Sequence, residues 1–265
     1  MLSGGMGLHL PSNARRGLVV SDLHLFIRRS RGAACFAALR DELATVDDLV
    51  LTGDSFDFRW STWPDPESTQ AAALAWLSQL AGDYPRCDIH FILGNHDCRP
   101  GFAAGLKKLA AALPRFHWHE YWLRLGPAAF LHGDCVMGVM DAAALDRYRQ
   151  GWRQDRHWAA FAPAYQCVDR LEISRLMHHC HFPRQRTVRR IAHYLDAACP
   201  GWRRETQDCY FGHTHLAFTN HEHEGIRFHN TGSAIRGMDF NPLFFETPPL
   251  ELEHAHQPEL ASRSP

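Results

Sequence analysis

The stretch Asp48-Leu-Val-Leu-Thr-Gly-Asp54 is a short apolar run that ends in a glycine and a carboxylate. Two similar stretches flank it, because Gly17-Leu-Val-Val-Ser21 leads into Asp22-Leu-His24, and Asp88 to Leu93 leads into Gly94-Asn-His-Asp97. Apolar runs of this length, bounded by turn residues, are typical of buried strands. The three stretches therefore predict strands that each carry a polar group at the carboxyl end.

Helical patterns separate these strands. Ala33 to Leu43 is rich in alanine and leucine, Glu67 to Leu80 places leucines on one face, and Phe102 to Leu113 is stopped by Pro114. Strand and helix alternate in this way where a largely parallel sheet is covered by helices. We therefore predict an α/β fold.

The pattern changes after Pro114. Phe116 to Leu125 alternates aromatic and polar residues and, with Ala128 to Leu131, predicts a hairpin that ends in His132-Gly-Asp134. From about Met140 to Trp202 the chain is predicted to be helical. Short strands are expected to complete the fold at Cys209–Phe211, Leu216–Thr219, Ile226–His229 and Leu243–Glu246.

Composition narrows the class of protein. The 265 residues carry 28 basic and 29 acidic side chains, and this balance argues against a general nucleic-acid binder. The eight cysteines form no Cys-x-x-Cys pair, and the start lacks the apolar region of a signal peptide. No stretch reaches the roughly 20 apolar residues that span a bilayer. We expect a cytoplasmic protein with reduced thiols.

Five polar motifs each follow a predicted strand directly. Ligands bind at the carboxyl ends of strands in open α/β sheets, so we expect the motifs to converge. Their Asp, His and Asn side chains suit Mn²⁺, Fe or Zn²⁺ better than Mg²⁺ or Ca²⁺. Two such ions, about 3.5–4 Å apart, can share one carboxylate. The motifs are Asp22-Leu-His24, Gly53-Asp54, Gly94-Asn-His-Asp97, His132-Gly-Asp134 and Gly212-His-Thr-His215.

Any one of these motifs alone is more often an ordinary strand-end loop. The ordered set, which includes Gly53-Asp-Ser-Phe-Asp57, resembles the calcineurin-like metallophosphoesterase superfamily. The resemblance implies a two-sheet αββα sandwich. It also implies a first metal at Asp22, His24 and His215, a second at Asn95, His132 and His213, a bridging carboxylate at Asp54, and a catalytic His96 that Asp97 orients.

The implied activity is hydrolysis of a phosphoester or phosphoanhydride. A hydroxide that bridges two divalent ions, with Mn²⁺ expected and Fe or Zn²⁺ as alternatives, attacks phosphorus. Asn95 and the metals hold the phosphate oxygens. Protonated His96 stabilises the developing charge or delivers a proton to the leaving group, which is typically worth about 10²–10⁴-fold in rate. A non-catalytic scaffold is the rival from another class, but all of the ligand positions are filled.

The long helical segment resembles one subfamily. Asp146-Arg-Tyr-Arg-Gln-Gly-Trp-Arg153 is similar to a helix of the UDP-2,3-diacylglucosamine pyrophosphatases, whose inserted lid holds acyl chains. That family usually has arginine where this chain has His96. The alternatives are a phosphodiesterase or a phosphoprotein phosphatase of the same superfamily. We expect a sandwich over 1–139 and 203–250, a lid over 140–202 and a poorly ordered tail over 251–265.

The same segment carries further candidate residues. A solvated face is the commoner explanation for its arginines, and binding of substrate phosphate or of an anionic membrane surface is the alternative. Its aromatic residues are expected to pack the lid on the sandwich or to line an apolar groove for a lipid-linked substrate. The arginines are Arg147, Arg149, Arg153 and Arg156, and the aromatics are Trp152, Trp158, Phe161 and Tyr165.

Two groups of histidines have no motif of their own. Met177-His-His-Cys-His181 follows a helical run and is interpreted as a surface helix end rather than as a metal site. His221, His223 and His229 lie on a predicted hairpin, where alternation places all three on one exposed face.

Overall fold

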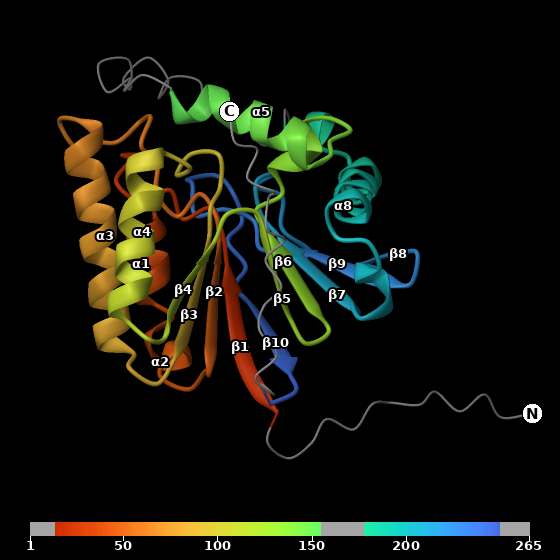
Figure 1. Ribbon diagram of the computed structural model, residues 1–265, viewed down its shortest axis with the longest axis horizontal. Helices are drawn as coiled ribbons and strands as arrows, with labels where there is room; N and C mark the ends of the chain where they lie inside the picture. Colours follow the sequence, from red (N-terminus) through yellow and green to blue (C-terminus); the bar gives the residue numbers. More distant parts are fainter. Residues whose placement is uncertain (1–13, 155–177, 250–265) are drawn as a thin grey trace, which may run out of the picture.

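The computed structural model describes residues 14–154 and 178–249. Two sheets of five strands each pack face to face, and helices cover the outer face of both (Figure 1). The predicted αββα sandwich is therefore confirmed. In the described ranges, no helix is both long and apolar enough to cross a membrane. The tail over 251–265 lies outside the described residues. So does the stretch between residues 154 and 178, which contains Arg156, Trp158, Phe161 and Tyr165.

The first sheet contains the three strands that the apolar runs predicted. Its order is β10-β1-β2-β3-β4, in which β1 to β4 run parallel and β10 is antiparallel. Helices or the other sheet cover both faces, which explains why these strands are almost continuously apolar. The strands are β1 (Arg15–Val20), β2 (Asp48–Thr52), β3 (Asp88–Ile92), β4 (Phe116–His119) and β10 (Leu243–Thr247).

The second sheet is built from the later part of the chain. Its order is β5-β6-β7-β9-β8, with β6, β7 and β9 parallel and both edge strands antiparallel. Its strands are β5 (Trp122–Leu125), β6 (Ala128–Leu131), β7 (Asp208–Phe211), β8 (Phe218–His223) and β9 (Ile226–Asn230).

Helices cover both outer faces. On the first sheet lie α1 (Gly32–Ala37), α2 (Arg40–Leu43), α3 (Pro66–Asp83) and α4 (Pro100–Ala112). On the second sheet lies α8 (Arg184–Ala198), whereas α5 (Ala142–Arg153) runs across the edge at the carboxyl ends of the strands; the short 3₁₀ turns are η1 (Asp134–Met137) and η3 (Trp202–Arg204). Asp65 and Asp141 cap α3 and α5, since their carboxylates accept from backbone N–H groups in the first turn.

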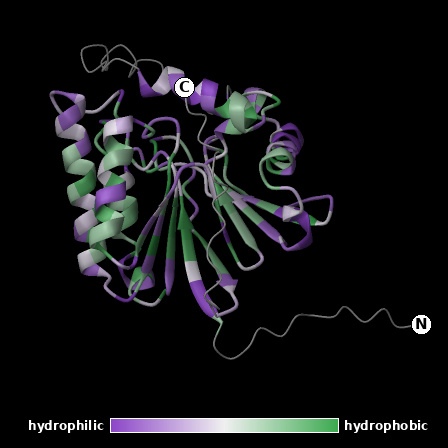
Figure 2. Cartoon of the chain, viewed as in Figure 1, coloured by the Kyte–Doolittle hydropathy of each residue, from purple (hydrophilic) through white to green (hydrophobic). Residues whose placement is uncertain are grey.

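Three apolar layers hold these elements together. One lies between the first sheet and its helices, one between the second sheet and α8, and one between the two sheets. Val50 and Ile92 of the first sheet face Phe130 and Tyr210 of the second in the central layer. Figure 2 shows the strands as mainly apolar and the outer helix faces as mixed. The central layer fixes the carboxyl ends of both sets of parallel strands at one edge.

The hairpin predicted from Phe116 to Leu131 is wrong in its first half. Phe116–His119 pairs with β3 as the edge of the first sheet, and only Trp122–Leu125 pairs with β6 in the second. The chain crosses between the sheets at Glu120 and Tyr121, where no glycine or proline interrupts the alternation. The single helix expected over Ala33–Leu43 is also divided, because Leu39 N bonds to Phe36 O in a tighter turn.

The three hairpin histidines do not share an exposed face. His221 pairs with Phe228 across the β8–β9 ladder, and a register shift lies between Phe218 and His221. His229 is buried instead, with Nε2 2.9 Å from Asp208 Oδ1 and its ring stacked on Tyr210. Because the turn of two residues sets His223 opposite Ile226, His221 and His223 share a face with Ile226 and Phe228, whereas His229 falls on the other face; the alternation counted straight through the turn was therefore wrong.

Candidate metal centre

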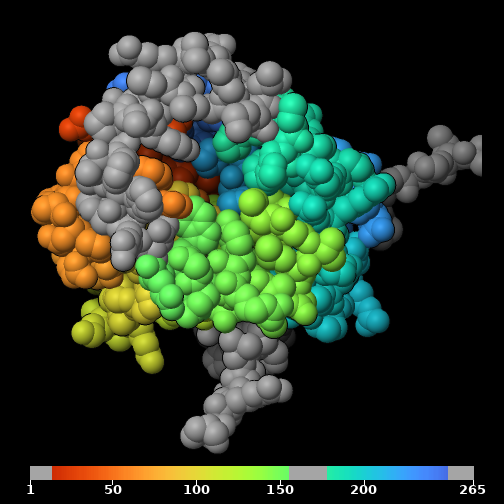
Figure 3. All heavy atoms as spheres, turned by 90° about the horizontal axis from the view of Figure 1, so that it is seen from above, coloured from red at the N-terminus to blue at the C-terminus, as the bar shows by residue number. Residues whose placement is uncertain are grey.

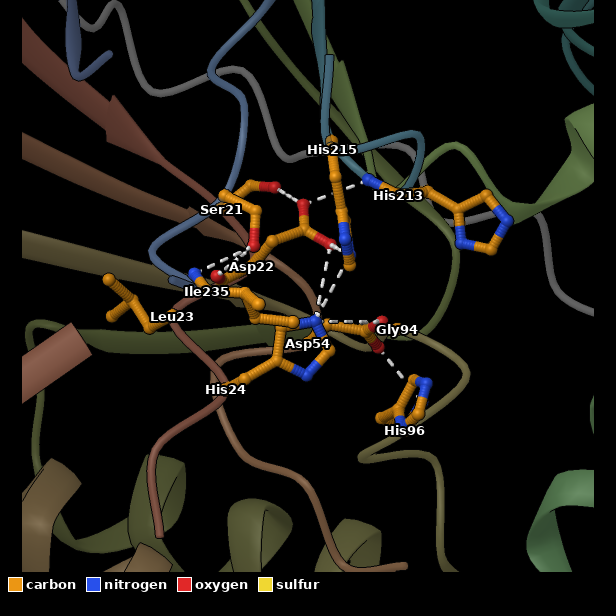
Figure 4. Close-up of polar contacts among 12 residues, drawn as sticks. Ser21, Asp22, Leu23, His24, Asp54, Gly94, His96, His213, His215 and Ile235 are labelled. Atoms are coloured by element: carbon orange, nitrogen blue, oxygen red, sulfur yellow. Dashed lines mark hydrogen bonds and ion pairs between the residues drawn. The ribbon is translucent and has the colours of Figure 1, made fainter. Parts of the chain in front are cut away.

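The first group of side chains comes from both sheets. Asp22 and His24 follow β1, and His215 follows β7 (Figure 4). Asp22 Oδ1 lies 3.1 Å from His215 Nε2 and 3.7 Å from His24 Nε2, and the two Nε2 atoms are 3.2 Å apart. These three side chains can offer one ligand atom each to a single ion.

The second group lies beside the first. His132 Nε2 is 3.2 Å from Asn95 Oδ1, 3.2 Å from His213 Nδ1 and 3.3 Å from Asp54 Oδ2. The same Asp54 Oδ2 is 4.0 Å from His24 Nε2 in the first group. The structure thus brings all of the expected ligand side chains together, with the Asp54 carboxylate between the two groups.

This donor set fits two divalent cations. Metal–ligand bonds of about 2.0–2.2 Å place neighbouring ligand atoms about 3 Å apart, close to the separations in both groups. Asp22 Oδ1 is buried and receives no well-formed hydrogen bond, although two imidazole nitrogens face it. Imidazole nitrogens and a carboxylate oxygen that converge in this way form a donor set that suits a divalent cation.

Outer contacts fix which atoms face the ions. His132 Nδ1 donates to Thr52 O at 2.9 Å, so its Nε2 is left with a lone pair that points into the site. Asp22 Oδ2 accepts from Ser21 Oγ and, at 2.8 Å, from His213 N, which leaves Oδ1 for the first group. Asn230 Nδ2 donates to Gly212 O and steadies the loop that carries both later histidines.

The backbone is unusual at these same positions. Eight described residues other than glycine have a positive φ, and five of the eight belong to the two groups. Their φ values lie between 45° and 63°, a left-handed conformation that costs on the order of 1–3 kcal/mol per residue. Strain concentrated in one place indicates that the fold holds these side chains for a function. The five are Asp22, His24, Asp54, His213 and His215.

The electrostatics favour positive charge in the site. Although burial opposes charged rings, the carboxylates of Asp22 and Asp57 raise the pKa of His24 to about 10. Asp54 likewise raises the pKa of His132 to about 10 against the effect of burial. Burial and the adjacent His132 lower the pKa of His213 to about 3. The buried carboxylates therefore stabilise positive charge on His24 and His132, and bound metal ions would take the place of the protons on these rings.

His96 is oriented by a different carboxylate from the one expected. Its Nδ1 lies 3.1 Å from Asp57 Oδ2, which is also 3.4 Å from His24 Nδ1. Asp97 instead turns inward and accepts from Gly94 N at 2.6 Å and from Ser55 N at 3.0 Å. The expected Asp97–His96 contact is therefore wrong, because Asp97 is used to fix two backbone loops.

Sequence comparison agrees with this geometry. The model of the family described as calcineurin-like phosphoesterase matches residues 16–217, a range that contains every side chain of both groups. The chain belongs to this family. It is a metal-dependent phosphoesterase, and its clustered aspartates and histidines agree with the dinuclear divalent-metal centre of a hydrolase.

Two solved structures are distantly similar to this phosphoesterase. Phosphopantetheinyl hydrolase from Mycobacterium tuberculosis has a TM-score of 0.41 and 14% identity over 82% of this chain and 89% of its own. A dimetal phosphatase from Danio rerio has a TM-score of 0.41 and 12% identity over 83% of this chain and 88% of its own. No curated protein sequence matches significantly. These similarities are too distant to transfer either protein's activity.

The phosphoesterase site has neighbours that the sequence did not indicate. The ring of His178 stacks on His215, with centroids 5.0 Å apart and planes at 18°, and its Nδ1 donates to Thr214 O at 3.0 Å. The surface helix end expected here is wrong for half-buried His178 but holds for exposed His179 and His181. The position of His178 depends on contacts with Thr214 and His215, which are distant in the sequence, so no pattern in the residues around His178 would have predicted it.

The arginines of α5 differ from one another. Arg147 is exposed, as expected for a solvated face, and Arg153 pairs with Asp146 and Glu120. Arg149 was expected on the exposed face, but only 1% of its surface is accessible and it pairs with Asp134. The ring of half-buried Trp152 lies 4.6 Å from that of His96. Helix α5 thus contacts the centre directly.

A hollow lies over this edge of the molecule. Figure 3 views it from above, between the orange loops of the first sheet and the green and teal atoms of α5 and α8. Red and blue segments, the colours of the loops after β1 and β7, are visible at its floor.

Proposed function

We propose that the centre binds two divalent cations, with Mn²⁺ as the preferred ion, and hydrolyses a phosphoester or phosphoanhydride. Asp22, His24 and His215 hold one ion and Asn95, His132 and His213 the other. Asp54 serves both. The observation that carries this proposal is the position of Asp54 Oδ2, 3.3 Å from His132 Nε2 and 4.0 Å from His24 Nε2.

The protein's own residues have separate tasks in this reaction. Bound cations supply an activated water and withdraw charge from the phosphoryl oxygens. His96 has its Nδ1 beside Asp57, so its Nε2 is the atom left to meet the leaving oxygen. Asp57 also holds His24, and it therefore links the orientation of the proton donor to that of the first group. In this proposal the amide of Asn95, which faces His132, also binds a phosphate oxygen.

For the substrate, we propose a nucleoside diphosphate linked to a lipid, of the UDP-2,3-diacylglucosamine type. Support comes from the Asp146–Arg153 motif, whose helix α5 packs beside His96 through Trp152. In this proposal residues 140–202 act as a lid that receives the acyl chains and touches the membrane surface from the cytoplasmic side. A simple phosphodiester is the second candidate, and His96 in place of arginine favours it.

Turnover assays separate the two candidates. The full chain, loaded with Mn²⁺, is tested against a chromogenic diester, a chromogenic monoester and UDP-2,3-diacylglucosamine. Cleavage of the sugar nucleotide supports the lipid-linked substrate. Turnover of the simple diester alone removes that proposal and leaves the diesterase. If none of the three is hydrolysed while two Mn²⁺ ions are bound, the proposed chemistry itself is wrong.

The role of His96 has its own test. His96→Ala removes the proposed proton donor without removing a ligand, so we expect turnover to fall by about 10²–10⁴-fold while the Mn²⁺ content stays at the wild-type level. His179→Ala, a change of an exposed histidine, is the matched control. Full activity of the His96 variant would exclude the role.

A further inference from the structure

Arg149 is a charged side chain buried beneath α5. Only 1% of its surface is accessible. Its Nε donates to Asp134 Oδ2 at 2.7 Å and its Nη2 to Asp134 Oδ1 at 2.9 Å, which is the two-pronged geometry that arginine forms best with a carboxylate. Burial of such a pair rarely adds stability, because desolvation offsets the attraction. A role other than stability is therefore indicated.

The remaining donors of Arg149 reach two other segments. Nη2 also donates to Leu93 O at 2.9 Å, and Nη1 donates to Glu120 O at 2.5 Å. The guanidinium lies 5.3 Å from the centre of the Tyr121 ring. Leu93 follows β3 of the first sheet, whereas Asp134 follows β6 of the second. One side chain therefore ties the two sheets together at the edge that carries the site.

Both tied loops carry members of the second group. Leu93 is two residues before Asn95, and Asp134 is two residues after His132. Asn95 Oδ1 and His132 Nε2 face each other at 3.2 Å across the junction of the two sheets. Cys98 adds to the same link, since its Sγ lies 3.3 Å from Asn95 O and 3.9 Å from Arg149 O.

The first group is held by other contacts. His24 N bonds to Asp54 O, and Ser233 Oγ and Ala234 N both bond to Asp22 O. Over residues 14–154 and 178–249, Arg149 makes no hydrogen bond to the loops of Asp22, His24 or His215. The tie is thus specific to one of the two groups.

We propose that Arg149 is a positioning residue that sets the separation of Asn95 and His132 and so the affinity of the second group for its cation. The inference rests on the proposed function, because it assumes that both groups bind metal. Lysine cannot replace this arginine, since a single ammonium cannot span a carboxylate and two carbonyls in a fixed plane.

The test is a titration of the full-length chain with Mn²⁺ after a chelator has removed metal, followed by calorimetry. We expect two bound ions in the wild type. In Arg149→Lys we expect one ion to bind with unchanged affinity and the other about tenfold more weakly, as is typical when an outer contact of a metal site is lost. On a His213→Ala background, where only the first group is complete, Arg149→Lys should leave the affinity unchanged.

Arg15→Lys is the matched control. Arg15 makes the same two-pronged pair with Asp48, at 2.9 and 2.8 Å, and also bonds Asp88 and a carbonyl. It lies at the start of β1, at the opposite end of the strands from the site. Loss of stability alone should therefore affect both variants, whereas selective loss of one Mn²⁺ should occur only in the Arg149 variant.

A second variant separates positioning from folding. Arg149→Met combined with Asp134→Leu removes both buried charges, which is often neutral for stability. We expect its unfolding midpoint to lie above that of Arg149→Lys while one Mn²⁺ still binds more weakly. Unchanged affinity for both ions, or equal weakening of both, in either variant overturns the inference. A wild-type chain that binds no Mn²⁺ overturns the proposed function, and the inference with it.

Discussion

At the scale of single residues, the centre depends on close approach of backbone to side chain. A Cβ atom on Gly94 would lie 2.2 Å from Asp54 Oδ1 and 2.5 Å from Asp54 N. One on Gly212 would lie 2.1 Å from Asp22 Oδ2. Glycine is required at Gly94 because the loops after the neighbouring strands β2 and β3 touch there, and at Gly212 because a loop of the second sheet touches the loop after β1.

Gly94→Ala should therefore displace Asp54 and weaken the binding of both ions. We expect the purified variant to hold less than half of the wild-type Mn²⁺, as measured by elemental analysis after equilibration at limiting metal, since typical outer-contact losses are about 10–100-fold in affinity. Gly82→Ala is the control, because nothing lies within 4 Å of a Cβ at this helical position. Normal metal content in the Gly94 variant would show that Asp54 does not hold the ions.

His178 acts on the first group from outside it. Its ring covers His215 and its Nδ1 fixes Thr214 O, so His178→Ala frees the rotation of a proposed ligand. We expect the affinity for one Mn²⁺ to fall by about tenfold, measured by calorimetry, with little change in the unfolding midpoint. His179→Ala, a change at the exposed neighbour, should behave as the wild type. Identical affinities in both variants would remove this role.

At the scale of elements, the sequence predicted the parallel strands well because each is apolar throughout and ends in a polar motif. The convergence of the five motifs followed, because the carboxyl ends of parallel strands meet at one edge, whereas the individual ligands were implied by the resemblance to the metallophosphoesterases. The crossing at Glu120 and Tyr121 was missed because alternation continues through it. The partner of His96 was missed because the curvature of the loop, and not spacing, decides whether Asp57 or Asp97 faces it.

Strand β4 also gives the fold a sensitivity to acid. Burial, and then the neighbouring His90 and His117, lower the pKa of His119 to about 3 from an ordinary value of 6.5. The unfolded chain therefore binds a proton that the folded chain does not, so the stability contributed by neutral His119 is present above pH 6.5 and is lost as the pH falls towards 3.

His119→Phe should remove this pH-dependent contribution to the free energy of unfolding. Between pH 6.5 and pH 5 we expect the variant to lose on the order of 2 kcal/mol less unfolding free energy than the wild type, measured by urea denaturation at each pH. His193→Phe, at an exposed position of α8, should leave the pH dependence as in the wild type. Parallel curves for the His119 variant and the wild type would contradict the buried neutral state.

At the scale of the whole molecule, the proposed metals join the two sheets. Asp22, His24, Asp54 and Asn95 come from the first sheet, and His132, His213 and His215 come from the second. Ions bound by both sheets stabilise only the folded chain. The sandwich architecture itself needs no metal, because the apolar layer between the sheets is continuous.

Removal of metal should thus lower stability without loss of the fold. At free Mn²⁺ about one hundred times the dissociation constant, binding adds about 2.7 kcal/mol per site, so a chelator that empties both sites should lower the unfolding midpoint by about 10–20 °C. Far-ultraviolet circular dichroism of the stripped chain should match that of the loaded chain. An unfolding midpoint independent of Mn²⁺ concentration would contradict this view.

The most direct test of the central claim is anomalous diffraction from crystals of the chain grown with Mn²⁺. We predict two peaks about 3.5–4 Å apart, one against Asp22, His24 and His215 and the other against Asn95, His132 and His213, with Asp54 touching both. A single peak, or peaks away from these side chains, would contradict the account.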